Sequence, residues 1–356
     1  MREKEIDEVS AGAPAEKRTL WQRLAGAQTA GGPSLVVKVG VLVVVLGIVL
    51  GALSVSYNMA SDEVRQGPLF EFMEDWVVKW DVVKWINQQI DWLVVHGDAF
   101  FSGIRDGVLI GILNPLRTFL LWLPWWLVII GTGVLAWRVV DRRIAIVVVL
   151  FLGLMGILGM HDLAMTTLAV VLTATLLCVA LGIPIGIVAA KSNRFDSISR
   201  PILDGMQTMP SFVYLVPALM LFGLGMVPAV LATCIYAIPP MIRLTNLGIR
   251  QVDSQILEAS RAFGTTTWQL LAKVQVPLAI PTILAGVNQT IMMALAMVVL
   301  ASMIGAAGLG VEVLTGLGRI NPGQAFVGGI SIVFLAIILD RISQGFASRP
   351  GARPAA

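Results

Sequence analysis

A polar stretch at residues 253–277, between two long apolar runs, holds the side chains whose types and spacing are most distinctive. Residues 253–254 are an Asp and a Ser, either of which can cap a short helix. Thr266 and Gln269 have the spacing of a capping box for a second short helix. The two helices are predicted to meet at Gly264, because glycine permits a sharp backbone turn. The chemistry that this layout suits is non-covalent: a small helical knob can dock in a cleft of a partner protein.

The first of these short helices would carry small residues between larger ones on one face. That face comprises Ile256, Ala259 or Ser260, and Phe263. An ordinary loop with helical turns would produce the same pattern without a partner, so the rest of the chain has to decide between the two interpretations.

Side chains that could perform covalent chemistry are scarce. His96 and His161 are isolated, and Cys178 and Cys234 both fall inside apolar runs. No Cys/His cluster has the spacing of a metal site, and no glycine-rich loop has the form of a phosphate cradle. We therefore expect a protein that is not an enzyme, with no catalytic residue, no metal and no cofactor of its own. The two cysteines are predicted to be packing residues.

The composition indicates a membrane protein with several spans. Hydrophobic residues make up 57% of the 356 residues, charged residues make up 13%, and the mean hydropathy is +0.84. A soluble domain of this length cannot bury so much apolar surface. A charge at the centre of a span costs about 2.5–3.5 kcal/mol, so charge-free windows locate the crossings. The crossings are predicted at 39–61, 118–137, 144–161, 163–190, 209–225, 229–243, 281–305 and 325–339, which makes eight.

The distribution of Lys and Arg predicts the orientation. If residues 250–275 are cytosolic, the loops from residue 138 onward hold 13 basic residues inside and only Arg319 outside. Basic residues concentrate on the cytoplasmic side of membrane proteins. Both termini are then predicted to be cytosolic. The net charge of +3 therefore marks topology and gives no indication of nucleic-acid binding.

The alternation of polar and apolar stretches also predicts the organisation of the chain. Four tryptophans at helical spacing, within an amphipathic helix at 69–96, suit the membrane interface better than an aromatic cage for a quaternary ammonium ion, because a cage needs rings from several elements. These are Trp76, Trp80, Trp85 and Trp92. The predicted segments are a flexible cytosolic tail (1–34), a transmembrane anchor (35–57), an external segment (58–117) with that helix, two peripheral transmembrane helices (118–160), a core domain (161–343) with a cytosolic loop at 244–280, and a cytosolic tail (344–356).

Polar residues inside the core spans mark the functional part of the membrane domain. Asn288, Gln289 and Thr290 fall near the middle of the crossing at 281–305. An amide in hydrocarbon must bond to another helix or face an aqueous path, so these residues either join helices or line a pathway. The core crossings contain no Asp, Glu or His. This absence argues against ion coupling and indicates that the energy for any transport comes from another chain.

The docking segment resembles the EAA motif of ABC importer permeases, which reads Glu-Ala-Ala-x3-Gly-x9-Ile-x-Leu-Pro. The spacing is the same, with Ser260 for Ala, Val274 for Ile and Val276 for Leu. More narrowly, the chain is similar to ProW-type permeases of glycine betaine and proline betaine importers over roughly residues 69–345. The runs that carry this similarity are 203–217, 238–245, 285–290 and 336–341.

The resemblance implies a type I ABC importer permease: an all-α multi-pass membrane protein with a MetI-like five-helix core and peripheral helices. It implies a role for two sets of residues. Coupling to the ATPase is assigned to Glu258, Ala259, Ser260, Ala262, Phe263, Gly264 and Pro277. The candidate translocation path comprises Thr208, Tyr214, Asn288, Gln289, Thr290 and Met293.

The resemblance also implies partners. Two copies of the permease would form the pore, two cytosolic ATPase subunits carrying ATP and Mg would grip the EAA segments, and an external binding protein would deliver the betaine. The expected location is the bacterial cell membrane. Two alternatives remain open: a permease for choline, carnitine or another small solute, and a stand-alone secondary carrier. Uptake by such a carrier would follow an ion gradient and would continue after ATP is depleted.

Overall fold

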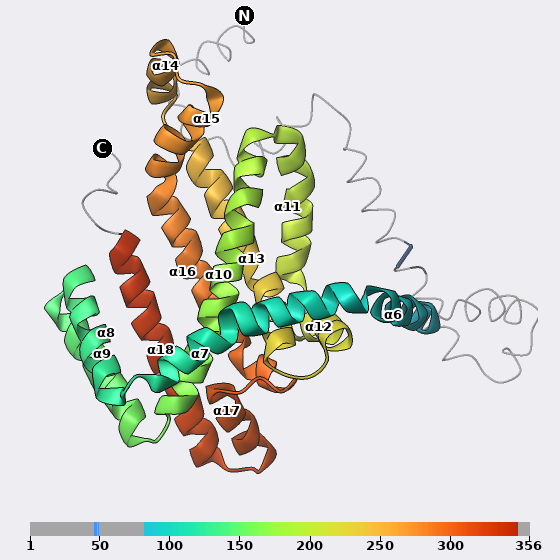
Figure 1. Cartoon of the computed structure of the whole chain (residues 1–356), viewed down its shortest axis with the longest axis vertical. Helices are drawn as coiled ribbons and strands as arrows, with labels where there is room; N and C mark the ends of the chain where they lie inside the picture. Colours follow the sequence, from blue (N-terminus) through green and yellow to red (C-terminus); the bar gives the residue numbers. More distant parts are fainter. Residues whose placement is uncertain (1–45, 48, 50–81, 348–356) are drawn as a thin grey trace, which may run out of the picture. The chain divides into compact units, whose positions relative to one another are not determined.

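The computed structural model of this protein describes residues 46, 47, 49 and 82–347. The chain divides into two units, Met1–Trp85 and Ile86–Ala356, and nearly all described residues belong to the second. The described residues form helices and no strands, which confirms the predicted all-α class (Figure 1). The α-helices are α6 (Val82–Val108), α7 (Asn114–Trp122), α8 (Trp125–Val139), α9 (Arg142–Ile157), α10 (His161–Lys191), α11 (Asn193–Thr208), α12 (Leu215–Phe222), α13 (Met226–Arg250), α14 (Ser254–Ala262), α15 (Thr267–Leu270), α16 (Val276–Ser302), α17 (Leu309–Gly318) and α18 (Pro322–Ala347). Two π-helices, η3 (Leu109–Leu113) and η5 (Leu271–Gln275), and the 3-10 helix η4 (Ser211–Tyr214) complete the order.

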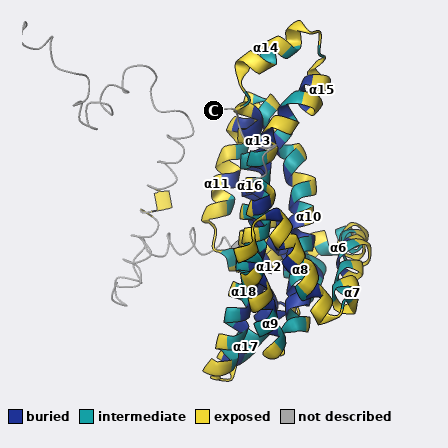
Figure 2. Cartoon of the chain, turned by 90° about the vertical axis from the view of Figure 1, so that its left-hand side faces the viewer, coloured by how far each residue is buried: buried dark blue, intermediate teal, exposed yellow. Residues whose placement is uncertain are grey.

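Four long apolar helices form the core of the second unit. α13 packs against both α10 and α16, and α16 packs against α18. Each of the four, with α15 and η5 continuing into α16, is long and apolar enough to cross a membrane. Figure 2 shows the buried residues concentrated along the centre of this bundle. The predicted core crossings that these helices confirm are 163–190, 229–243, 281–305 and 325–339.

Small residues bring α10 and α13 into close contact, as expected for helices that associate in a membrane. A Cβ atom at Gly186 would lie 2.6 Å from Cβ of Thr245 and 2.8 Å from the carbonyl oxygen of Ile242. Cys178 and Cys234 meet across the same pair of helices, with their Sγ atoms 3.6 Å apart. Both cysteines are buried and free, in agreement with the packing role predicted for them.

The crossing predicted at 209–225 is wrong. α11 continues to Thr208, and the chain then turns by 107° into η4 and α12. The cause is Pro210, which holds the residue before it out of the helical region. Met209 accordingly has φ −67° and ψ 136°. η4 and α12 have only 4 and 8 residues, too few to cross a hydrocarbon core of about 30 Å at about 1.5 Å per residue.

The peripheral helices also differ from the prediction. The amphipathic helix predicted at 69–96 does not end at residue 96, because α6 runs on to Val108 and continues through η3 into α7. Ile104 and Val108 extend its apolar face and pack against α10 and α13. The crossing predicted at 118–137 is broken at Pro124, where the two parts bend by 102°.

The number of spans is smaller than predicted over the described residues. Four helices qualify by length and composition, or up to six if each bent pair counts as one span. The predicted crossing at 144–161 corresponds to α9, whose 16 residues are short for a span. The anchor predicted at 35–57 lies outside the described residues apart from residues 46, 47 and 49, and so do residues 69–81 of the amphipathic helix.

A short helix, α17, lies in the chain between the two core helices α16 and α18. Its first amide, of Leu309, donates a hydrogen bond to Oγ1 of Thr167 at 2.8 Å. Gln324 of α18 donates to a carboxylate oxygen of Glu312 at 2.7 Å. These contacts attach α17 to α10 and α18, at the end of the bundle opposite α14 (Figure 1).

Candidate docking site at the α14 knob

The residues predicted to dock a partner form a compact projection from the bundle. We define the α14 knob as residues 253–270, which contain α14, α15 and the turn between them. The chain reaches the knob from α13 after two residues and leaves it through η5 into α16. The predicted cytosolic loop at 244–280 is therefore helical over most of its length. Figures 1 and 2 show α14 projecting beyond the ends of the other helices, with mostly exposed residues.

Local capping explains why these residues fold as two short helices. The carboxylate of Asp253 accepts a hydrogen bond from the amide of Gln255 at 2.9 Å, so Asp253 caps α14. Thr266 and Gln269 form a reciprocal capping box at the start of α15, with distances of 3.0 and 3.3 Å. Both features were predicted from the sequence, although the choice between Asp253 and Ser254 was open.

The turn between the two helices depends on glycine. Gly264 has φ +79°, in the left-handed region that residues with a side chain rarely adopt. The amide of Gly264 donates to the carbonyl of Arg261 at 2.9 Å. Both the amide and the hydroxyl of Thr265 donate to the carbonyl of Ser260, at 3.3 and 2.8 Å. These bonds satisfy the last carbonyls of α14 and set the angle at which α15 departs.

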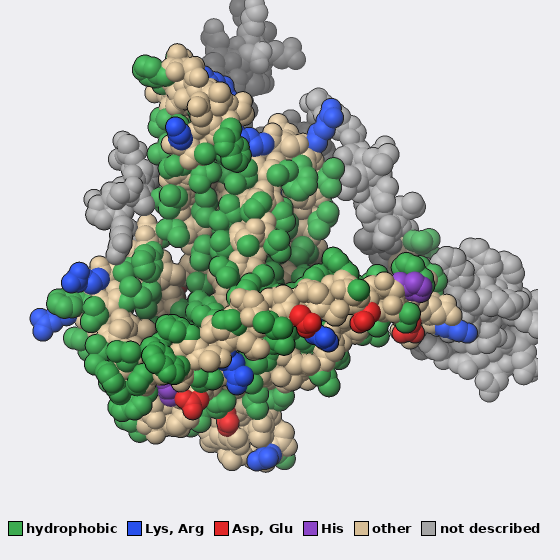
Figure 3. Space-filling model, viewed as in Figure 1, with side chains coloured by type: hydrophobic (Ala, Val, Ile, Leu, Met, Phe, Trp, Pro, Cys, Tyr) green, Lys and Arg blue, Asp and Glu red, His purple; other side chains and the backbone are tan. Residues whose placement is uncertain are grey.

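The knob presents apolar surface that no other part of the described chain covers. Phe263 is 90% exposed and Trp268 is 73% exposed, and α14 contains no buried residue. In Figure 3 this projecting end carries hydrophobic and basic side chains on its surface. The carboxylate of Glu258 is exposed and makes no ion pair within the described residues. Exposed aromatic side chains beside an unpaired charge are typical of a surface that binds another protein.

Pro277 joins the knob to the membrane domain. It has no amide hydrogen, so a regular α-helix would leave the carbonyl four residues earlier without a partner. The widened turn of η5, in which the amide of Val276 donates to the carbonyl of Leu271, takes up this break. Helix therefore continues from Thr267 to Ser302. Nζ of Lys191 donates to the buried side chain of Gln275 at 2.6 Å and fastens the start of α16 to the end of α10.

The candidate path residues of α16 lie on different faces of the helix. The side chain of Asn288 donates to Asp340 of α18 at 3.0 Å and accepts a hydrogen bond from Ser343 of the same helix. Asn288 therefore joins α16 to α18. Gln289 is exposed, whereas Thr290 is fully buried and its hydroxyl has no hydrogen-bond partner among the described residues. Met293 is half-buried against the main hydrophobic core.

The two remaining path candidates lie at the bend after α11. The hydroxyl of Thr208 donates to the carbonyl of Gly205 at 3.0 Å, and the side chain is exposed. Tyr214 is buried, its hydroxyl donates to the carbonyl of Met206, and its ring meets that of Tyr236 edge-on at 6.0 Å. The six candidates therefore do not converge on one site.

A polar cluster beside the root of the knob was not predicted. Asp196 of α11 is buried and bonds to Arg200 and to Asn246, and Arg250 of α13 lies next to it. Arg200 and Arg250 are two of the 13 basic residues whose positions predict the cytosolic side. Asp196 and Arg200 are four residues apart, a spacing that places two side chains on the same face of a helix. This spacing is the one local signal for the cluster in the sequence.

Comparison with known proteins identifies the family. The family model described as "Binding-protein-dependent transport system inner membrane component" matches residues 182–350. The glycine betaine/proline betaine transport system permease protein ProW of Escherichia coli (strain K12) is 52% identical over 261 residues, which cover 73% of each chain. This chain belongs to that permease family. The predicted resemblance is thereby confirmed, and the chain is a multi-pass membrane permease subunit.

Other relatives of this permease extend the range of named solutes. The glycine betaine/carnitine transport permease protein GbuB of Listeria monocytogenes serotype 1/2a (strain 10403S) is 45% identical over 272 residues, which cover 74% of this chain and 95% of GbuB. Among solved structures, an inward-facing MetNI methionine ABC transporter matches with a TM-score of 0.47 and 22% identity, over 52% of this chain and 94% of that chain.

Proposed function

We propose that this permease imports glycine betaine, proline betaine or a related quaternary-ammonium solute, with energy from ATP hydrolysed on partner subunits. The names of the relatives ProW and GbuB support the class of solute. Two copies of the chain would form the pore, an external binding protein would deliver the solute, and two cytosolic ATPase subunits would dock on the α14 knob.

The observation that carries this proposal is the exposed knob. α14 has no buried residue, and both Phe263 at its end and Trp268 of α15 are uncovered. Exposed apolar side chains grouped in this way mark a surface that a partner protein covers. The knob continues into α13 on one side and into α16 on the other, and both helices belong to the core. A displacement of the knob by an ATPase would therefore act on two core helices together.

In this mechanism the permease performs no covalent chemistry. Glu258 pairs with a basic residue of the ATPase, and Ala259 and Ser260 permit close approach. Gly264 holds α14 at its angle to α15, and Pro277 lies where this unit enters the membrane. Closure of the ATPase pair on ATP moves the knobs, and the core helices pass from inward-open to outward-open. Differential affinity of the ATPase pair for the two states drives the change.

The experiment is a substitution at the turn, in the permease reconstituted in liposomes with its ATPase and binding protein. Gly264→Leu places a branched side chain at a positive φ, at a cost of roughly 1–2 kcal/mol, and α14 is expected to lose its angle. Insertion and expression should be unchanged, whereas ATP-dependent uptake of glycine betaine should fall at least about tenfold.

The matched control is Gly264→Asn, because asparagine tolerates the left-handed region better than other residues with a side chain. This variant is expected to keep most of the uptake. Normal uptake by Gly264→Leu, with its ATP hydrolysis still stimulated by the loaded binding protein, would contradict the coupling role of the turn.

A further inference from the structure

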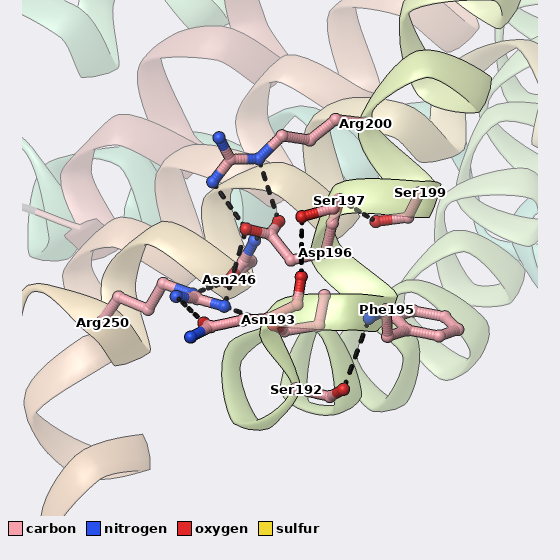
Figure 4. A network of polar contacts seen from close by, with 10 residues as sticks. Ser192, Asn193, Phe195, Asp196, Ser197, Ser199, Arg200, Asn246 and Arg250 are labelled. Atoms are coloured by element: carbon pink, nitrogen blue, oxygen red, sulfur yellow. Dashed lines mark hydrogen bonds and ion pairs between the residues drawn. The ribbon is translucent and has the colours of Figure 1, made fainter. Parts of the chain in front are cut away.

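The cluster around Asp196 lies where α10, α11 and α13 meet, beside the end of α13 that leads to the knob. Asp196 is only 5% exposed, which is rare for a carboxylate unless the charge is paired. Figure 4 shows side chains from α11 and α13 converging on it, with Arg200 on one side and Asn246 and Arg250 on the other.

Both carboxylate oxygens of Asp196 are satisfied. Oδ1 accepts from Nε of Arg200 at 3.1 Å and from Nδ2 of Asn246 at 2.7 Å. Oδ2 accepts from Nη2 of Arg200 at 2.6 Å and lies 3.5 Å from Nη2 of Arg250. The two bonds from Arg200 form a bidentate pair, the strongest geometry for a carboxylate and a guanidinium.

Arg250 extends the cluster to a third helix. Its guanidinium donates to the side chains of Asn193 and Asn246 and to the carbonyl of Ala189, each at 2.8 Å. Ala189 belongs to the last turn of α10, Asn193 to the start of α11 and Asn246 to α13. One guanidinium and one carboxylate thus tie together the cytosolic ends of three helices.

The position of the cluster links the knob to the bend of α11. Arg250 is the last residue of α13, and α14 begins at Ser254. At its other end α11 reaches Thr208 and the 107° turn that leads to the buried Tyr214. α13 touches this turn directly only through Tyr236, whose ring meets that of Tyr214, and through its packing against η4 and α12. A movement of the end of α13 would also shift α11 itself, and with it the start of the turn, if the cluster holds the two helices together.

A second ion pair on the same two helices provides the contrast. Arg243 of α13 pairs with Asp204 of α11, but the Asp204 side chain is 66% exposed. Exposed pairs contribute little, whereas the loss of one partner from a buried pair leaves an uncompensated charge. The two pairs line one cleft of about 320 Å³ between α11 and α13.

We propose that the Asp196 cluster is the joint that makes α11 move with α13 when the knob is displaced, so that the ATPase acts on the bend at residues 208–214. Asp196, Asn246 and Arg250 are positioning residues in this proposal: they touch no solute. The proposal rests on the proposed function, because it concerns how a displacement of the knob reaches the membrane domain.

The first experiment compares Asp196→Asn with Asp204→Asn in the reconstituted permease, its ATPase and its binding protein. The readout is the amount of glycine betaine taken up per ATP hydrolysed. Asp196→Asn is expected to lower this ratio at least about tenfold while ATPase binding persists. Asp204→Asn should stay within about twofold of the parent. An unchanged ratio for Asp196→Asn would overturn the proposal.

The second experiment replaces the polar contacts of Asp196 by a disulfide bond that can be reduced. It tests the proposal even if Asp196→Asn fails to fold. Asp196→Cys and Asn246→Cys are combined, since these short side chains touch in the structure, in a background with Cys178→Ala and Cys234→Ala. With the dithiol reduced, uptake per ATP should be low. Oxidation to the disulfide should restore it to within about threefold of the background protein.

If the oxidised protein takes up no more solute per ATP than the reduced protein, the proposed coupling of α11 to α13 is wrong. Loss of ATP-dependent uptake in the parent protein itself would instead refute the proposed function, and the two failures are therefore distinguishable.

Discussion

Single residues in this permease separate into those that build the knob and those that a partner would contact. Gly264 and Thr266 build it, through a positive φ and a capping box. Phe263 and Glu258 are exposed and contribute nothing to the packing of the described chain. A residue that is exposed in the isolated chain and covered in a complex can be removed with little effect on folding and a large effect on binding.

Phe263→Ala is therefore expected to leave the thermal stability of the detergent-solubilised permease unchanged and to weaken co-purification of the ATPase strongly. The measurement is the amount of ATPase retained per permease on an affinity column.

Ile157→Ala is the control for this test, because Ile157 is 84% exposed but ends α9, away from the knob. This variant should retain the ATPase fully. Equal ATPase retention by the two variants would mean that Phe263 is not part of the docking surface.

At the scale of the elements, close contacts at glycine decide how the core helices pack. Gly186 of α10 faces Thr245 and the backbone of Ile242 on α13. Gly153 of α9 faces open space, with no atom beyond its own stretch of helix within 4 Å of a Cβ built there. Replacement of glycine by alanine is therefore expected to have opposite effects on stability at the two positions.

Gly186→Ala is expected to destabilise the protein by about 1–3 kcal/mol, because the added methyl group forces α10 and α13 apart. Gly153→Ala should be neutral or stabilising, since alanine is favoured over glycine in a helix by about 1 kcal/mol. Thermal unfolding of the two variants in the same detergent compares them. A lower melting temperature for Gly153→Ala than for Gly186→Ala would contradict the packing described for α10 and α13.

At the scale of the whole molecule, the charge distribution and the fold suggest one orientation. From residue 138 onward, the loops expected inside carry 13 basic residues, and the loops expected outside carry Arg319 alone. α14 and α17, the helix that precedes Arg319, lie at opposite ends of the bundle (Figure 1). The positive-inside rule then predicts that the knob is in the cytosol and that α17 is outside.

Single cysteines test this orientation in intact cells treated with a membrane-impermeant maleimide. Leu317→Cys, in α17, is expected to react from outside. Gln255→Cys, in α14, should react only after the membrane is permeabilised. The two native cysteines are buried and should stay unlabelled. Labelling of residue 255 in intact cells would reverse the orientation and remove the basis for ATPase docking.

Local interactions were predictable from the sequence. The all-α class, the long core helices and the permease family follow from apolar runs and from the EAA-like spacing. The caps of α14 and α15 and the turn at Gly264 depend on residues at most five apart. Such interactions can be predicted from the sequence because the interacting groups are close neighbours along the chain.

Only the tertiary structure decided which polar groups meet. A charge-free window does not reveal that the chain bends at Pro210, after α11, because hydropathy carries no information on the direction of the backbone. The sequence leaves open whether Asn288 joins helices or lines a path. Its contact with Asp340, 52 residues away, shows that it joins α16 to α18. Asp196 meets Asn246 across 50 residues of chain. Contacts of this kind depend on how the helices are placed in space, and short-range patterns of residue type do not encode that placement.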